Sequence, residues 1–140
     1  MSIQMIGIDH TRAGIDVRTV FSFTKKKMAE ALAVLQKVPG IEGCVLISTC
    51  NRMELWASTD DGFPEEGLYE QLCKIKEADP GMYRPYFVFR KEREAVQHLF
   101  WLAGGLKSRI LGEDQIVTQV GEALSFAREQ YATDSVMETL

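Results

Sequence analysis

The sequence predicts an α+β domain with a ferredoxin-like βαββαβ sheet and additional C-terminal helices. Three observations carry this prediction. Short apolar runs bounded by turn residues indicate four strands, apolar positions at helical spacing indicate two helices between them, and the C-terminal third also has helical spacing. A chain of 140 residues is long enough to form one domain with a hydrophobic core.

The first strand and first helix are predicted near the N-terminus. The apolar run Ile3 to Ile8 indicates a strand, and Thr24 is expected to cap the helix that follows. Pro39-Gly40 should end that helix. Its apolar face is expected to consist of Met28, Ala31, Leu32 and Leu35.

A strand pair is predicted next, over Cys44 to Ser48 and Met53 to Ala57. The link between them, Thr49-Cys50-Asn51-Arg52, is expected to form their turn. Asn51 suits a turn because asparagine tolerates left-handed backbone angles better than most residues.

The second helix should have Pro64 in its first turn, with Glu65 and Glu66 favouring its positive end. Asp79-Pro80-Gly81 is expected to end it, and Tyr86 to Phe89 is the fourth predicted strand. The apolar stripe of this helix consists of Leu68, Leu72 and Ile75.

Two further helices are predicted beyond the sheet. The first ends at Gly104-Gly105, and the second follows a loop and runs towards the C-terminus. Their apolar positions are Ala95, Val96, Leu99, Phe100, Leu102 and Ala103 in the first, and Ile116, Val120, Ala123, Ala127 and Tyr131 in the second.

Composition and charge exclude several classes of protein. Hydrophobic residues make up 46% and charged residues 26% of the chain, as in soluble globular proteins, and no apolar run is long enough for a membrane span. The net charge of −4 argues against nucleic acid as an electrostatically obvious partner. Three cysteines without a C-x-x-C pair indicate reduced thiols, a cytoplasmic location and no zinc site.

The most informative segment joins a thiol and a guanidinium two residues apart, Cys50 and Arg52. A thiolate at the tip of a strand is a potential nucleophile, and a guanidinium can hold a carboxylate through two hydrogen bonds. This pairing suggests covalent chemistry on an acidic substrate. The competing interpretation is a buried, inert cysteine beside a surface arginine.

Other polar residues have two interpretations each. His98 is either a packing residue on a helix or a general acid or base that assists Cys50, and His10 either lines a site or belongs to an ordinary loop. Glu113 and Asp114 either complement a helix N-terminus or belong to a polar substrate site. Ser108, Gln115 and Gln119 are the further candidates for that site.

Taken together, four ordered blocks resemble the N-terminal catalytic domain of glutamyl-tRNA reductase. The blocks are Gly7-Ile8-Asp9-His10 with Arg18; Ser48-Thr49-Cys50-Asn51-Arg52-x-Glu54; His98-Leu99-Phe100; and Gly105-Leu106-x-Ser108 with Leu111-Gly112-Glu113-x-Gln115-Ile116 and Gln119-Val120. Each motif is short, but their order extends across nearly the whole chain.

The resemblance implies a chemical role for Cys50. Its thiolate would attack the ester of glutamyl-tRNA and form a glutamyl thioester, which NADPH reduces to glutamate-1-semialdehyde for tetrapyrrole biosynthesis. His98 matches a family histidine important for activity, and Arg52 would hold a glutamate carboxylate. The glutamyl site would be shaped by Thr49, Asn51, Ser108, Glu113, Asp114, Gln115 and Gln119.

The resemblance also implies parts that this sequence lacks. No G-x-G-x-x-G occurs, so NADPH is expected to bind a domain not present here. Residues 1–112 would form the catalytic domain, and residues 113–140 a helix that packs on it and begins the linker to the NADPH-binding and dimerisation domains. The expected partners are glutamyl-tRNA, a second copy joined through the absent domain, and the downstream semialdehyde aminomutase, with no membrane.

Some positions depart from the family pattern. Asp9 stands where the family usually has Asn, Lys107 and Arg109 flank Ser108 in place of Asp and Met, and Asp114 replaces Pro. These changes leave two alternatives open, a non-catalytic relative that binds glutamyl-tRNA or regulates the pathway, and a stand-alone thiol esterase.

Overall fold

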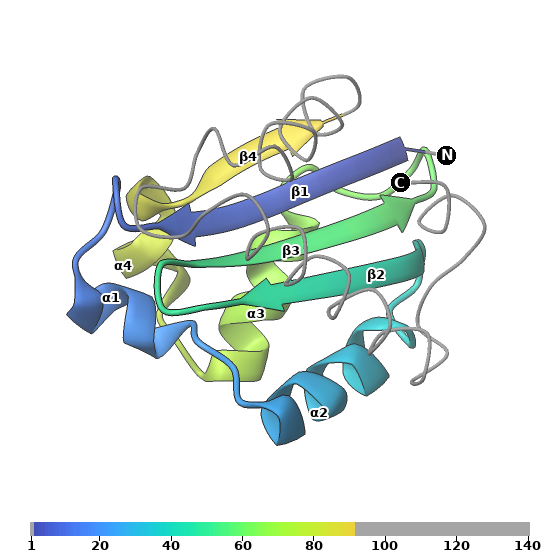
Figure 1. The fold of residues 1–140 in the computed structure, drawn as a ribbon. Coiled ribbons are helices and arrows are strands. Elements are labelled where there is room, and N and C mark those ends of the chain that lie inside the picture. The colour runs from blue at the N-terminus through green and yellow to red at the C-terminus, as the bar shows by residue number, and fades with distance from the viewer. Residues whose placement is uncertain (1, 92–140) are drawn as a thin grey trace, which may run out of the picture.

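The computed structural model describes residues 2–91 of the chain. The predicted C-terminal helices and the domain boundary at residue 112 lie outside this part. Figure 1 shows the elements, which in chain order are β1 (Ser2–Asp9), α1 (Ile15–Val20), α2 (Lys25–Leu35), β2 (Ile41–Ser48), β3 (Arg52–Thr59), α3 (Gly67–Lys76), α4 (Pro80–Tyr83), the 3-10 helix η1 (Arg84–Tyr86) and β4 (Val88–Lys91).

The four strands form one antiparallel sheet in the order β2-β3-β1-β4. β2 and β4 are therefore the edge strands of this described sheet, and β3 lies between β1 and β2 (Figure 1). The β1–β3 pairing runs without interruption from Ser2↔Thr59 to Asp9↔Arg52. This long register fixes where the β2–β3 turn lies relative to the end of β1.

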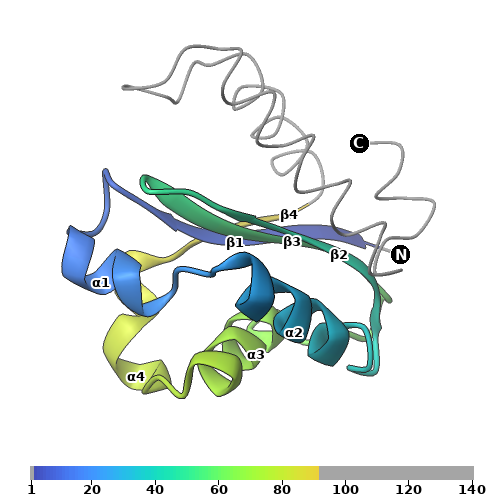
Figure 2. The ribbon, with the colours of Figure 1, turned by 60° about the horizontal axis from the view of Figure 1, so that its bottom comes forward.

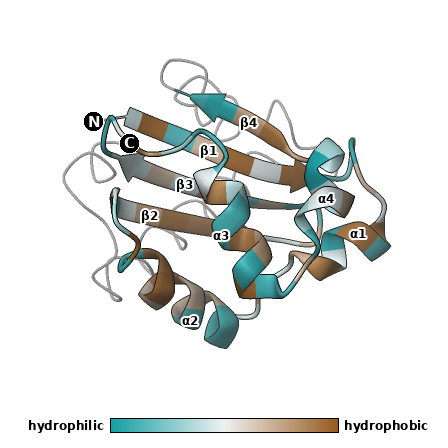
Figure 3. Ribbon diagram, turned by 180° about the vertical axis from the view of Figure 1, so that it is seen from behind, coloured by the Kyte–Doolittle hydropathy of each residue, from teal (hydrophilic) through white to brown (hydrophobic). Residues whose placement is uncertain are grey.

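The described helices lie on one face of the sheet (Figure 2). Viewed from the helix side, β1 and β2 are largely hydrophobic, whereas the end of β4 is hydrophilic (Figure 3). The hydrophobic core includes residues of α2, α3 and the strands that are at most 1% exposed. They include Ile6, Leu32, Leu35, Leu46, Leu55, Leu68 and Leu72.

The predicted start of the first long helix is confirmed. Thr24 has an extended backbone, and its hydroxyl accepts a hydrogen bond from the Lys27 amide at 3.2 Å. Ala31, Leu32 and Leu35 of the predicted apolar face are buried. An N-cap of this kind satisfies one of the amides that the first turn of a helix leaves without a partner.

The prediction for the second helix was wrong at both ends. α3 begins at Gly67, because the Gly67 amide closes a separate turn on the carbonyl of Pro64 at 3.0 Å. The helix ends at Lys76, and Glu77 adopts left-handed angles (φ 52°). Asp79 begins α4 instead, since its carboxylate accepts a hydrogen bond from the Gly81 amide at 3.0 Å.

The start of the fourth strand was also predicted too early. Arg84–Tyr86 forms η1, and the Phe87 amide donates to the Arg84 carbonyl at 3.1 Å. Arg84 is held by an ion pair with Glu66 at 2.7 Å. The chain reaches the sheet only at Val88, which pairs with Gly7.

Two smaller differences concern the connections that follow β1 and β2. The short helix α1 was not predicted, because its six residues show no apolar periodicity and none is buried. Asn51 lies in the turn as predicted but does not use the left-handed angles that asparagine tolerates. Within residues 2–91, the only non-glycine residue with positive φ is Glu77.

Within residues 2–91, no helix combines the length and apolar character that crossing a bilayer requires.

Candidate active site

The β2–β3 turn is closed by its own backbone and by one hydroxyl. The Thr49 amide donates to the Arg52 carbonyl at 2.8 Å. The Thr49 hydroxyl accepts from the amides of Asn51 at 3.2 Å and Arg52 at 3.3 Å. Cys50 lies within this closed turn, and it is the exposed cysteine among the described residues. The turn therefore presents the thiol to solvent on a restrained backbone.

Residues far away in sequence hold the turn from outside. The His10 amide donates to the Asn51 carbonyl at 2.9 Å, which joins the end of β1 to the turn. The Arg18 guanidinium donates to the Cys50 carbonyl at 3.4 Å and to the Ala13 carbonyl at 2.8 Å. Arg18 thus links the start of α1 to the residue that carries the thiol.

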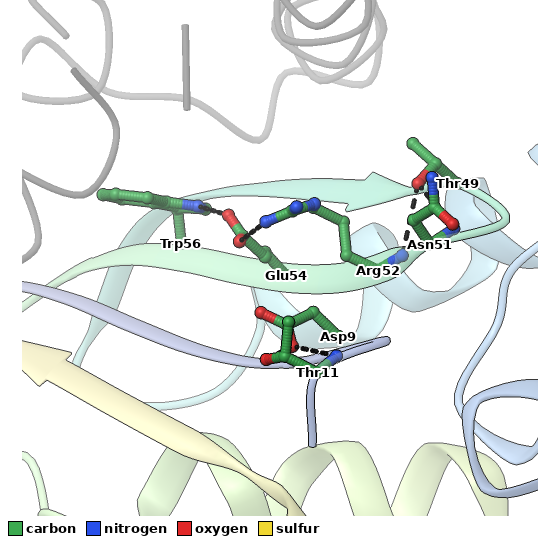
Figure 4. Close-up of polar contacts among 7 residues, drawn as sticks. All are labelled: Asp9, Thr11, Thr49, Asn51, Arg52, Glu54 and Trp56. Carbon is green, nitrogen blue, oxygen red and sulfur yellow. Dashed lines mark hydrogen bonds and ion pairs between the residues drawn. The ribbon is translucent and has the colours of Figure 1, made fainter. Parts of the chain in front are cut away.

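Arg52 follows the turn as the first residue of β3, and its side chain is only 2% exposed. Its Nη1 lies 3.5 Å from Oε2 of Glu54, and Oε1 of Glu54 accepts a hydrogen bond from the Trp56 indole at 3.0 Å. Figure 4 shows these three side chains in a row along β3, with Arg52 nearest the turn. We refer to Arg52, Glu54 and Trp56 as the β3 row.

The β3 row lies on the sheet face opposite the helices. Ser48 accepts a hydrogen bond from the Phe23 amide, which lies in the segment before α2, and Ser48 pairs with Met53. Met53 therefore faces the helices. Because side chains alternate along a strand, Arg52 and Glu54 point to the other face.

Asp9 places a second carboxylate near Arg52 from the neighbouring strand. Its Oδ1 accepts hydrogen bonds from the Thr11 amide at 2.9 Å and from the Thr11 hydroxyl at 2.5 Å (Figure 4). Partial burial raises the pKa of the Asp9 carboxyl, but these hydrogen bonds and the positive charge of Arg52 outweigh it and lower the pKa below its ordinary value. Asp9 is therefore an anion at neutral pH.

The exposures are the reverse of those in the competing interpretation from the sequence, a buried cysteine beside a surface arginine. Cys50 is exposed, whereas Arg52 is 3% exposed. Of the predicted site residues, the structure brings together Thr49, Cys50, Asn51 and Arg52. The others lie outside the described residues, namely His98, Ser108, Glu113, Asp114, Gln115 and Gln119.

Sequence reasoning did not assign roles to Glu54 and Trp56, although both follow Arg52 at the two-residue spacing of a strand face. That spacing was the available signal. The contact of Arg18 with Cys50 depends on the path of α1, and the sequence placed Arg18 in the first family block without connecting it to the turn.

The arrangement suits attack on a carbonyl by the exposed Cys50 thiol, with the oriented cation of Arg52 two residues further along the chain. Within residues 2–91, no cluster of His, Cys, Asp and Glu side chains is positioned to hold a metal ion.

Comparison with known families decides the assignment of the chain. The family model described as "Glutamyl-tRNAGlu reductase, N-terminal domain" matches residues 6–140. The chain belongs to this family. The matched range includes the turn, the β3 row and every site residue predicted from the sequence.

Individual members of the glutamyl-tRNA reductase family are similar over the whole chain. A glutamyl-tRNA reductase of Acetivibrio thermocellus is 44% identical, and the match covers 100% of this chain and 42% of the relative. A "Probable multifunctional siroheme biosynthesis protein HemA" of Ruminiclostridium josui is 37% identical, with coverage of 100% and 27%. The chain thus spans less than half the length of these curated relatives.

A solved structure has the same arrangement. Glutamyl-tRNA reductase from Methanopyrus kandleri superposes with a TM-score of 0.75 at 26% sequence identity, over 97% of this chain and 30% of that one. The mixed α/β architecture with a four-stranded antiparallel sheet is therefore that of the reductase N-terminal domain.

Proposed function

We propose that this chain is the catalytic domain of a glutamyl-tRNA reductase and that Cys50 is its nucleophile. The observation that carries the proposal is the exposed thiol on the closed β2–β3 turn, two residues before a buried arginine. Family membership supports glutamyl-tRNA as the substrate.

The chemistry proposed for this chain is a transfer of the glutamyl group. The Cys50 sulfur forms a bond to the ester carbonyl carbon, and the bond from that carbon to the terminal ribose oxygen of the tRNA breaks. The ribose hydroxyl leaves with a proton, and glutamate stays on the enzyme as a thioester. No electrons are exchanged in this step, so it needs no nicotinamide.

Arg52 is proposed to hold a glutamate carboxylate, because its guanidinium is fixed close to the turn and can offer a planar pair of donors. Thr49 and Asn51 complete the part of the site on the turn. The proposal extends to six residues outside the described part of the chain, with His98 as a catalytic group and Ser108, Glu113, Asp114, Gln115 and Gln119 as substrate contacts.

The strand order supports assignment of the sheet to the ferredoxin-like class, in which a βαβ unit is split by an inserted strand. We assign residues 1–112 to this catalytic domain. Residues 113–140 are assigned to a helix that packs on it and begins the linker to further domains.

NADPH is the expected reductant of the complete enzyme, but the residues of this chain do not fit it. No G-x-G-x-x-G fingerprint is present in the sequence, and we derive no reduction step from this chain. Binding of NADPH and dimerisation are proposed for parts of the enzyme outside this sequence, and the semialdehyde aminomutase is proposed as a further partner.

The test is single-turnover acylation with tRNA that carries radiolabelled glutamate. The wild-type chain should release uncharged tRNA as it acquires label in a thioester, lose labelled glutamate slowly as water hydrolyses that thioester, and form no semialdehyde when NADPH is added. Cys50→Ser should retain no thioester, whereas Cys73→Ser, which changes a buried cysteine of α3, should still be labelled.

Other outcomes would favour the alternatives. A wild-type chain that binds glutamyl-tRNA without acquiring label would indicate a non-catalytic or regulatory relative. Equal acylation by unrelated acyl esters would indicate a general thiol esterase. Formation of semialdehyde by the purified 140-residue chain would contradict the proposal that reduction by NADPH requires a domain outside this sequence.

A further inference from the structure

The β3 row contains a carboxylate that the proposed thioester chemistry does not use. Each oxygen of Glu54 has a different partner, with Oε1 accepting from the Trp56 indole at 3.0 Å and Oε2 lying 3.5 Å from the Arg52 guanidinium. The three residues are 1–3% exposed. A buried carboxylate with a contact at each oxygen has a fixed orientation. It therefore also restricts the orientation of the cation with which it pairs.

The position of Glu54 decides what it can do. Arg52 lies between Glu54 and the turn that carries Cys50 (Figure 4). The two oxygens of Glu54 are directed at Arg52 and Trp56 and not at the thiol. Glu54 therefore acts on a substrate at the turn through Arg52, as a positioning residue.

The neighbouring strand β1 has a glycine directly opposite Glu54. Gly7 of β1 is the register partner of Glu54. A Cβ atom at Gly7 would lie 3.0 Å from Cγ of Glu54 and 2.9 Å from the Met53 carbonyl oxygen. Glycine at this position leaves the Glu54 side chain the space it occupies beside Arg52.

We propose that Glu54, itself fixed by Trp56, holds the Arg52 guanidinium in the orientation that receives the substrate carboxylate. This inference rests on the function proposed for Arg52. A long arginine side chain that is already oriented loses less rotational freedom when it binds a carboxylate, so the support strengthens binding of the substrate.

The kinetic test measures how thioester formation depends on the concentration of glutamyl-tRNA. In Glu54→Gln, the concentration that gives half the maximal rate should rise by about tenfold, as expected for loss of one charge-assisted contact. The maximal rate should change less. Glu54→Asp, which retains the charge, should recover part of the loss, and Trp56→Phe should shift the same concentration by a smaller factor.

Leu55→Val is the matched control, because Leu55 lies between Glu54 and Trp56 on β3 and is 0% exposed. It should lower the melting temperature without changing the half-saturating concentration. A second readout is independent of turnover. NMR of the arginine guanidinium groups should show slow rotation for Arg52 in the wild type and faster rotation in Glu54→Gln, with the Arg52→Lys spectrum providing the assignment.

The outcomes separate this inference from the proposed function. If wild type and Glu54→Gln form the thioester with the same half-saturation, or if Leu55→Val shifts it equally, the role of Glu54 is overturned and the function of Cys50 stands. Unchanged rotation of the Arg52 guanidinium in Glu54→Gln also overturns it. A wild-type chain that forms no thioester overturns the function proposed for Cys50, and the rotation of the Arg52 guanidinium in wild type and Glu54→Gln then still tests the role of Glu54.

Discussion

Asp9 and Arg52 lie directly opposite each other as the last residue of β1 and the first residue of β3. Burial raises the pKa of the Asp9 carboxyl. The hydrogen bonds from Thr11 and the positive charge of Arg52 outweigh burial and lower the pKa below its ordinary value. Arg52 also pairs with Glu54 on its own strand. One buried cation is thus stabilised by carboxylates on two strands.

Replacement of Asp9 by Asn should make stability less dependent on pH. The pKa of Asp9 is lower in the folded protein, so its carboxylate stabilises the fold above the unfolded pKa, and this contribution is lost as the pH falls through the folded pKa. Asp9→Asn should therefore be less stable than wild type at pH 7. The difference should shrink as the pH drops below about 4, the unfolded value for Asp.

Urea unfolding at a series of pH values measures this effect. Glu42→Gln is the control, because Glu42 is exposed on the edge strand β2. A gap between wild type and Asp9→Asn that stays constant from neutral to strongly acidic pH would show that the carboxylate charge of Asp9 does not stabilise the fold.

Replacement of Arg18 by Ala should loosen the turn that carries Cys50. The guanidinium bridges the Cys50 and Ala13 carbonyls, so its loss should cost about 1 kcal/mol of stability per hydrogen bond. Small displacements of a nucleophile are costly, and the single-turnover rate of thioester formation should fall by roughly tenfold to a hundredfold.

Arg12→Ala is the matched control for Arg18, because Arg12 is an exposed arginine in the same connection between β1 and α1. It should preserve both the melting temperature and the acylation rate. Equal rates for Arg18→Ala and Arg12→Ala would rule out a role of Arg18 in placing the thiol.

Replacement of Gly7 by Ala should strain the β1–β3 pair. The added methyl group would lie 2.9 Å from the Met53 carbonyl oxygen, and overpacking of this kind costs about 1–3 kcal/mol. In Gly62→Ala, the nearest atom is a carboxylate oxygen of Asp60 at 3.8 Å, an ordinary contact. Chemical denaturation should show a large loss of stability for the first variant and almost none for the second.

Removal of the Thr24 hydroxyl should weaken the start of α2. Thr24→Ala removes the acceptor for the Lys27 amide and should lower the free energy of unfolding by about 1 kcal/mol. Thr24→Ser keeps that acceptor and should remain close to wild type. If the alanine and serine variants unfold at the same urea concentration, the cap does not stabilise the helix.

The sequence predicted those parts of the fold that local chemistry determines. The Thr24 cap and the apolar positions of α2 are set by neighbouring residues, and both were predicted correctly. The ends of α3 and the start of β4 were not, because short turns at Gly67, Gly81 and Phe87 replace the helix and strand continuations that the same residues also allow. The ion pair between Arg84 and Glu66, which holds one of these turns, joins residues 18 positions apart.

The same distinction applies to the candidate site. Cys50 and Arg52 were proposed as site residues from one short segment, because a thiol and a guanidinium suggest their chemistry by residue type. Which of the two is buried could not be predicted, since burial is set by the tertiary packing around each side chain and not by residue type. The contribution of Arg18 was missed because it reaches the turn from 32 positions away.

The uninterrupted pairing of β1 with β3 has a consequence for how this segment tolerates changes in length. A residue inserted within β3 between Arg52 and Glu54 would turn one of them towards the helices, because successive side chains point to opposite faces. A residue inserted in the turn would leave the β3 row in place and displace only the thiol. Insertions at these two sites would therefore affect the two proposed roles separately, one disabling the carboxylate recognition proposed for Arg52 and the other only the nucleophile proposed at Cys50.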